Sequence, residues 1–249
     1  MLDTVWMEEQ TWMETRDSIR SGKTTVIVGA GSMEQNGPYN ANGKHTYVLR
    51  STCEAIARRL GNALCAPIVP LEPGPPAEPG LRAGTIVITP ETFRSILMDM
   101  ATSLKTTGFT HIVFIADSGG GVGGMKDAAA ALNEQWRGTS ARVYYIPEYY
   151  QEDRWSFDFL KTIGVNQIPD RRSAMRYDVH DDYHYEALVA LTDPRLVRAE
   201  QRIKAGKFSI NGVEIGSVYM LVANGKRILE HRATLTANAI RRAIAGEGQ

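Results

Sequence analysis

The sequence has few cysteines, few histidines and no excess of either charge, and each shortage excludes a class of protein. Its 249 residues include 2 cysteines and 5 histidines, and 28 basic residues balance 28 acidic ones. Two cysteines do not make a disulfide framework, and Cys53 and Cys65 lie in apolar segments, so we expect buried thiols in a reducing compartment. Without net charge, the chain lacks the basic excess with which nucleic-acid and membrane-surface proteins bind phosphates.

Long apolar runs are also missing. No segment approaches the roughly eighteen apolar residues of a membrane span, and the acidic start MLDTVWMEEQTWMETRD lacks the apolar core of a secretion signal. The composition, 43% hydrophobic and 22% charged, is near the globular average. We therefore expect a cytoplasmic globular protein that binds neither nucleic acid nor membrane.

Short apolar runs alternate with segments of helical periodicity, which predicts an α/β fold. The runs are continuous, as in strands that are covered on both faces of a mostly parallel sheet. The predicted strands are 24–31, 65–71, 84–89, 111–117 and 141–148, and the predicted helices are 47–60, 90–107, 124–136, 186–193 and 226–245. A hairpin is expected around Asn211 and Gly212.

Two further segments are expected to be loops. The proline-rich stretch 72–80 (EPGPPAEPG) cannot form a regular element, and the aromatic, acidic stretch 149–185 has little periodicity. Because no repeat or linker interrupts the chain, residues 1–249 are predicted to form a single layered α/β/α domain with a mostly parallel central sheet.

Two predicted strands end in glycine-rich sequences. The first, GAGSMEQNG, resembles a dinucleotide-binding fingerprint, but Glu34 replaces its third glycine and would face the pyrophosphate, so we expect no nucleotide there. The second, SGGGVGG, begins at Ser118 directly after the strand 111–117. Glycines in this place let backbone N–H groups approach an anion or oxyanion. Ser118 itself is either a helix cap or a catalytic group, and the sequence leaves both open.

The order of these segments resembles that of the creatininase (creatinine amidohydrolase) family. The resemblance covers roughly residues 20–200 and rests on VGAGSMEQNGP, GTI, LMDMATSLKTTGF, the glycine cluster and VHDDYHYEALVALTDPRLV. It implies a creatininase-like α/β/α domain that hydrolyses or opens a C–N bond in a small cyclic amide or related metabolite. It also implies a homo-oligomer, which in family members is commonly a hexamer.

Family members hold two divalent ions, and the resemblance implies that most of the ligands are absent here. Glu34 keeps the family residue, whereas the other corresponding positions hold Asn36, Tyr39, His45, Ser118 and Gly120. His45 replaces a bridging aspartate, and a neutral imidazole has a single lone pair, so it cannot bridge two metals. We therefore expect no two-metal centre.

Three functions remain open, and the first is hydrolysis by acid–base chemistry without a metal. Glu34 and His45 would form the acid/base pair, because a carboxylate raises the pKa of a neighbouring imidazole and fixes its tautomer. His180 aligns with a family histidine that passes a proton to the leaving group. The predicted catalytic residues are Glu34, His45, Ser118 and His180, and the predicted substrate-binding residues are Asn36, Tyr39, Asp117, Gly119 and Gly120.

The other two functions differ in what the site binds. In the second, one divalent metal such as zinc is held in a rearranged site by Glu34, His45 and either Asp117 or His184. In the third, the chain is a non-catalytic relative that binds a small molecule or supports a partner subunit. His184 is otherwise expected to be a solvated loop histidine, and His111 and His231 to be surface or packing residues. In every case the pocket is expected at the carboxyl ends of the parallel strands.

Overall fold

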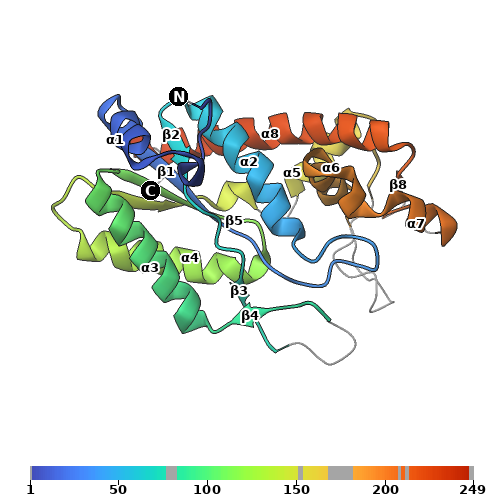
Figure 1. Cartoon of the computed structure of the whole chain (residues 1–249), viewed down its shortest axis with the longest axis horizontal. Helices are drawn as coiled ribbons and strands as arrows, with labels where there is room; N and C mark the ends of the chain where they lie inside the picture. Colours follow the sequence, from blue (N-terminus) through green and yellow to red (C-terminus); the bar gives the residue numbers. More distant parts are fainter. Residues whose placement is uncertain are drawn as a thin grey trace.

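The computed structural model describes residues 2–76, 83–150, 154–167, 182–206, 209–210 and 213–246. Its centre is a parallel sheet of four strands in the order β2-β1-β5-β6 (Figure 1). These strands are β1 (Thr25–Ala30), β2 (Ala63–Cys65), β5 (His111–Ala116) and β6 (Arg142–Tyr145).

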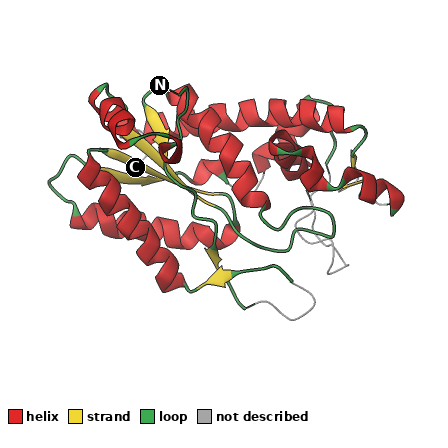
Figure 2. Cartoon of the chain, in the orientation of Figure 1, coloured by secondary structure: helices red, strands yellow, loops and turns green. Residues whose placement is uncertain are grey.

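Helices cover both faces of the sheet, as Figure 2 shows. On one face, α3 (Pro90–Thr107) and α4 (Gly119–Gln135) pack against Val28 and Phe114; on the other, α2 (Lys44–Leu60) and α8 (Val218–Ala245) pack against Ile27 and Ile115. Successive strand residues point to opposite faces, so β1 and β5 supply both cores. The predicted α/β/α layering around a parallel sheet is confirmed.

A third core lies beyond the sheet. The first half of α8 packs through Leu221 and Ile228 against Leu188 of α6 (Tyr183–Thr192). The remaining elements are η1 (Met7–Glu9), α1 (Trp12–Arg20), β3 (Glu72–Pro73), β4 (Val87–Ile88), η2 (Pro147–Tyr149), α5 (Arg154–Thr162), η4 (Pro194–Val197), α7 (Ala199–Lys204), β7 (Ser209–Ile210) and β8 (Val213–Glu214). None of the described helices combines the length and the apolarity needed to cross a membrane.

Helix α3 follows its local sequence signals closely. The Thr89 hydroxyl accepts a hydrogen bond from the Thr92 N–H at 3.1 Å, and Pro90 takes the first helical position, where its missing N–H costs nothing. Gly108 ends the helix with φ of 117°, a conformation that favours glycine. The predicted range 90–107 is confirmed, and the antiparallel pairing of β7 with β8 confirms the predicted hairpin strands.

Several predicted boundaries are wrong: a tertiary strand pairing overrides one of them, and a local helix cap decides another. The segment 84–89 does not join the central sheet, since β4 pairs with β3 in a separate small sheet. The proline-rich stretch 72–80 therefore begins with a regular element, although residues 77–82 lie outside the described part. Helix α4 already begins at Gly119, and α8 begins at Val218, where the Ser217 hydroxyl caps it. The stretch 149–185 contains α5, and residues 168–181 lie outside the described part.

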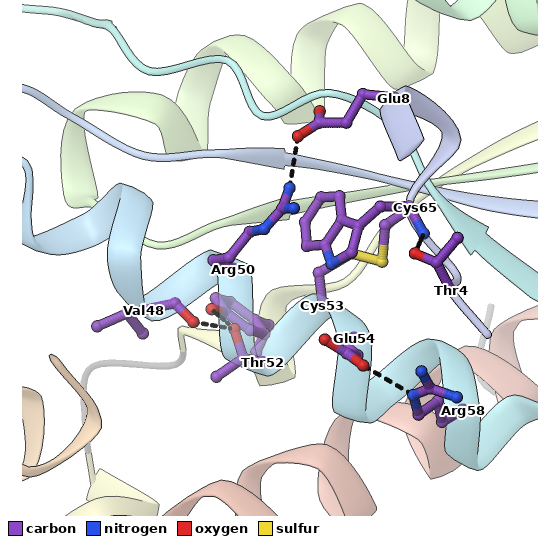
Figure 3. The surroundings of a disulfide bond; sticks show 11 residues. Thr4, Glu8, Val48, Arg50, Thr52, Cys53, Glu54, Arg58 and Cys65 are labelled. Atoms are coloured by element: carbon purple, nitrogen blue, oxygen red, sulfur yellow. Dashed lines mark hydrogen bonds and ion pairs between the residues drawn. A yellow bond between two sulfur atoms is a disulfide. The ribbon is translucent and has the colours of Figure 1, made fainter. Parts of the chain in front are cut away.

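The two cysteines are buried as expected, but they form a disulfide, which corrects the expectation of free thiols (Figure 3). Cys53 lies on α2 and Cys65 at the end of β2, 12 residues along the chain, with their Cα atoms 6.3 Å apart. The chain reverses at Gly61, so the helix and the strand lie side by side. Trp6, 2% exposed, packs in the same core, and its backbone pairs with Cys65.

Reduction of this disulfide is expected to lower the free energy of unfolding by about 3 kcal/mol, the chain-entropy value for a closed loop of about 15 residues. Denaturant unfolding with and without dithiothreitol measures the difference. The double variant Cys53→Ala/Cys65→Ala is the control, because its stability should not respond to the reductant. Equal stability of the oxidised and reduced wild-type chain would contradict a stabilising cross-link.

Candidate active site

Three titratable side chains from separate segments form one hydrogen-bonded chain at the carboxyl ends of β1 and β5. Glu34 follows β1, Asp117 follows β5 directly, and His45 lies in the first turn of α2. The distance from His45 Nε2 to Glu34 Oε1 is 2.8 Å, and that from His45 Nδ1 to Asp117 Oδ2 is 2.9 Å. Both ring nitrogens are thus held by carboxylates, which fixes the orientation of the imidazole.

The segment after β1 approaches α2 closely, and this brings Glu34 to His45. A Cβ atom added to Gly31 would lie 3.0 Å from the backbone nitrogen of Thr46, so a side chain there would press on the helix. Asn36, fully buried, donates from Nδ2 to the carbonyls of Glu34, Ala41 and Asn42 at 2.9–3.2 Å. This nitrogen is used within the loop, and a contact of Asn36 with substrate stays a prediction.

Asp117 lies behind His45 and not on a substrate-facing surface, which differs from the predicted substrate-binding role. Its side chain is fully buried; Oδ1 accepts a 2.7 Å hydrogen bond from the Tyr149 hydroxyl and lies 3.0 Å from Arg232 Nη2. Burial raises the pKa of Tyr149 well above its ordinary value, so the phenol stays protonated and donates. The Thr52 hydroxyl lies 2.8 Å from the same phenol oxygen. Asp117 is therefore placed to orient His45, with Arg232 balancing its charge.

Opposing effects act on the charge of His45. Burial and the neighbouring Lys44 lower the pKa of the imidazole, but its hydrogen bonds to Asp117 and Glu34 raise it more, so the net shift is upward. The protonated ring can donate to both carboxylates at once, which the neutral ring cannot do. The exposed fraction of the side chain is 18% for Glu34, 5% for His45 and 0% for Asp117, so Glu34 is the member of this chain that faces outward.

Glu72, on β3, was not predicted from the sequence as a site residue. It is 8% exposed, and burial raises the pKa of its carboxyl group. The Glu34 carboxylate also raises this pKa. Hydrogen bonds from the Ser118 hydroxyl and the Gly120 N–H, together with His45, lower it, but the net shift is upward. These interactions place Glu72 beside the Glu34–His45 pair. The sequence pattern that could have indicated Glu72 is a carboxylate directly after the apolar run CAPIVPL, but this segment was expected to be only a loop.

Ser118 and the glycines after it begin helix α4. Ser118 is the N-cap residue and is 6% exposed, but its side chain makes no capping hydrogen bond. Its hydroxyl instead forms a hydrogen bond with the Glu72 carboxyl group, which lowers the pKa of that group. Gly120 lies against Glu72, and a Cβ on Gly124 would lie 2.7 Å from the Phe93 ring. Close packing thus explains two of the glycines, and an oxyanion-binding role for the Gly119 and Gly120 amides stays a prediction.

The remaining candidates have mixed outcomes. Tyr39 is half-buried, with the Arg202 guanidinium 5.2 Å from its ring centre. His184 is fully buried on α6, with its ring 4.2 Å from that of Tyr185, so the expected solvated loop histidine is wrong. His180 lies outside the described residues. His231 stacks on Phe159, and His111 lies beside Tyr144, as expected for packing residues.

Comparison with known proteins gives the family. The family described as Creatininase, creatinine amidohydrolase, matches residues 8–235. A structure of a creatininase point mutant has 17% sequence identity and a TM-score of 0.70, covering 97% of this chain and 99% of that one. A structure described as creatininase Mn has 19% identity and a TM-score of 0.68, with coverages of 97% and 99%.

A third structure, described as creatinine amidohydrolase (creatininase), has 18% identity and a TM-score of 0.64, and covers 99% of this chain and 98% of that one. A search of curated proteins found no match. The family match spans most of the sequence, and the structural matches show the same fold. The chain therefore belongs to the creatininase family of hydrolases.

Proposed function

We propose that this protein hydrolyses a C–N bond of a small cyclic amide or related metabolite without a two-metal centre, with Glu34 and His45 as the acid/base pair. The observation that carries this proposal is the hydrogen-bonded chain from Glu34 through His45 to Asp117. The Glu34 carboxylate is partly exposed, and the Asp117 carboxylate is fully buried beside Arg232. This arrangement provides an acid/base group with an orienting partner behind it.

The side chains present do not fit a pair of divalent ions. Creatininase structures described as Mn and as Zn-Zn type are among the structural matches, and these metals are those of the matched proteins. Here both ring nitrogens of His45 form hydrogen bonds with carboxylates, and Asn36 Nδ2 donates to backbone carbonyls of its loop. Among the described residues, no group of three or more His, Cys, Asp and Glu side chains is arranged to hold a metal. The proposed mechanism uses no metal ion.

The proposed reaction needs one water molecule and a proton carrier. The Glu34 carboxylate accepts a proton from water as the water oxygen bonds to the amide carbonyl carbon. His45, held by Asp117, stabilises the charge on Glu34 and keeps the carboxylate oriented. When the C–N bond breaks, the proton on Glu34 passes to the departing nitrogen, so the opened product carries a carboxylic acid and an amine, and Glu34 returns to its initial state.

Metal content and turnover test this proposal together. We expect purified protein to open one or more members of a panel of small cyclic amides at a rate that chelator does not change. Elemental analysis showing about two bound ions per chain would overturn the metal-free mechanism. About one ion, with activity lost on chelation, would favour the rearranged zinc site. A folded protein that binds cyclic amides but opens none would favour the non-catalytic relative.

The homo-oligomer implied by the resemblance stays a prediction, which the native molecular mass tests. Exposed apolar side chains at the start of α8 support it. Val218, Tyr219 and Met220 are 38%, 79% and 50% exposed. Such a cluster suits a contact between copies of the chain.

A further inference from the structure

The Glu72 carboxyl group occupies the space in which a side chain of residue 120 would lie. A Cβ atom added to Gly120 would be 2.5 Å from Glu72 Oε2, 2.8 Å from Glu72 Cδ and 2.7 Å from the Pro73 carbonyl oxygen. Glycine at 120 therefore lets β3 place a carboxyl group against the first turn of α4. The group enters from an element that the central sheet does not include.

One oxygen of this carboxyl group has an unused hydrogen-bonding capacity. Glu72 is more than nine-tenths buried, and its Oε2 atom has no hydrogen-bond partner among the described residues. A buried acceptor without a donor costs free energy, and a ligand that supplies a donor recovers it. Glu72 also interacts with Glu34, His45 and Ser118, so its oxygen belongs to the same site as the proposed acid/base pair.

We propose that Glu72 is a further catalytic residue, which touches the substrate by accepting a hydrogen bond at Oε2 from an N–H group of the cyclic amide. This inference rests on the proposed function. Glu34 acts on the attacking water, and Glu72 holds the substrate by the N–H. A donor at Oε2 favours the ionised carboxylate and so opposes the effect of burial. A site built to bind an N–H discriminates strongly against analogues that lack it, because the buried acceptor is then left unpaired.

The test compares hydantoin, which carries two N–H groups, with 1,3-dimethylhydantoin, which carries none. For the unchanged chain, we expect kcat/KM to be at least about tenfold higher for hydantoin. Glu72→Met keeps the approximate side-chain length but removes the acceptor, and should abolish this preference while the midpoint of thermal unfolding stays the same or rises. Glu91→Met, at an exposed position on α3, is the matched control and should keep the preference.

A second variant separates the acceptor from the charge. Glu72→Gln keeps a side-chain oxygen that can accept the N–H, and should prefer hydantoin more strongly than Glu72→Met does. A Glu72→Met protein that keeps the preference within twofold overturns the inference, as does a folded Glu72→Gln protein with no more preference for hydantoin than Glu72→Met.

Failure of the proposed function is recognised separately. If the unchanged chain opens neither hydantoin nor any other cyclic amide, the hydrolytic function fails. The contact of Glu72 with an N–H group is then judged by the dissociation constants of the same two probes, measured by calorimetry. If the ratio of the dissociation constants for 1,3-dimethylhydantoin and hydantoin is the same in the unchanged chain and in Glu72→Met, the proposed contact of Glu72 with the N–H group is overturned.

Discussion

Replacing Glu34 by Gln is expected to lower kcat by about 10²–10⁴-fold, the usual contribution of a general acid or base. The amide keeps the shape of the side chain and its contact with His45, but it cannot take a proton from water. His45→Ala should cause a loss of the same order, because Glu34 then loses the partner that orients its carboxylate. Steady-state kinetics on whichever cyclic amide the wild type opens provide the measurement.

The two substitutions should not be additive. If Glu34 and His45 act as one unit, the double variant loses little more than either single variant. His231→Ala is the matched control, because His231 stacks on Phe159 at 4.1 Å and is not part of the Glu34–His45–Asp117 chain. Full activity in both single variants would remove the acid/base pair from the mechanism.

Asp117→Ala is expected to lower the free energy of unfolding by about 3–5 kcal/mol, the usual cost of removing one partner of a buried ion pair. Asp117 is fully buried, and the substitution leaves Arg232 and His45 without its carboxylate. The Tyr149 hydroxyl loses its acceptor at the same time. Urea unfolding, followed by circular dichroism, measures the change.

A neighbouring aspartate provides the control for this substitution. Asp127 lies exposed on α4, so Asp127→Ala should change the free energy of unfolding by no more than about 0.5 kcal/mol. Asp117→Asn separates stability from activity, because the amide keeps the shape but no longer favours the Nδ1–H tautomer of His45. We expect Asp117→Asn to lose much of the activity and less of the stability. A loss below about 1 kcal/mol in Asp117→Ala would contradict the importance of this buried network.

Local sequence signals determined the elements that they specify directly. The continuous apolar runs at 24–31 and 111–117 became the two central strands, because such runs are stable only when both faces are covered. Thr89, Pro90 and Gly108 defined the ends of α3 through the hydrogen-bonding needs of helix termini. The resemblance to the creatininase family also implied that Glu34 meets His45, since both stand at positions of the family's metal ligands.

Only the tertiary structure decided which distant groups meet. The Cys53–Cys65 disulfide arises because α2 folds back along β2, and nothing in the apolar sequence around the two cysteines indicates this. Asp117 looked like a pocket residue, but the packing of α8 brings Arg232 to it and places it behind His45. Glu72 was overlooked because its neighbours in the sequence are prolines, whereas its neighbours in space are Glu34, Ser118 and Gly120.

The sequence by itself thus determined the layered α/β fold and the pairing of Glu34 with His45 in the candidate site. Together with the short supply of histidine, the resemblance indicated an altered creatininase site, because most positions of the family's ligands hold Asn36, Tyr39, Ser118 and Gly120, and His45 replaces the bridging aspartate. The tertiary structure decided that His45 lies between two carboxylates and that a third carboxyl group is supplied by a separate strand. The physical reason is that helix and strand formation depend on neighbours along the chain, whereas hydrogen bonding and burial of charge depend on neighbours in space.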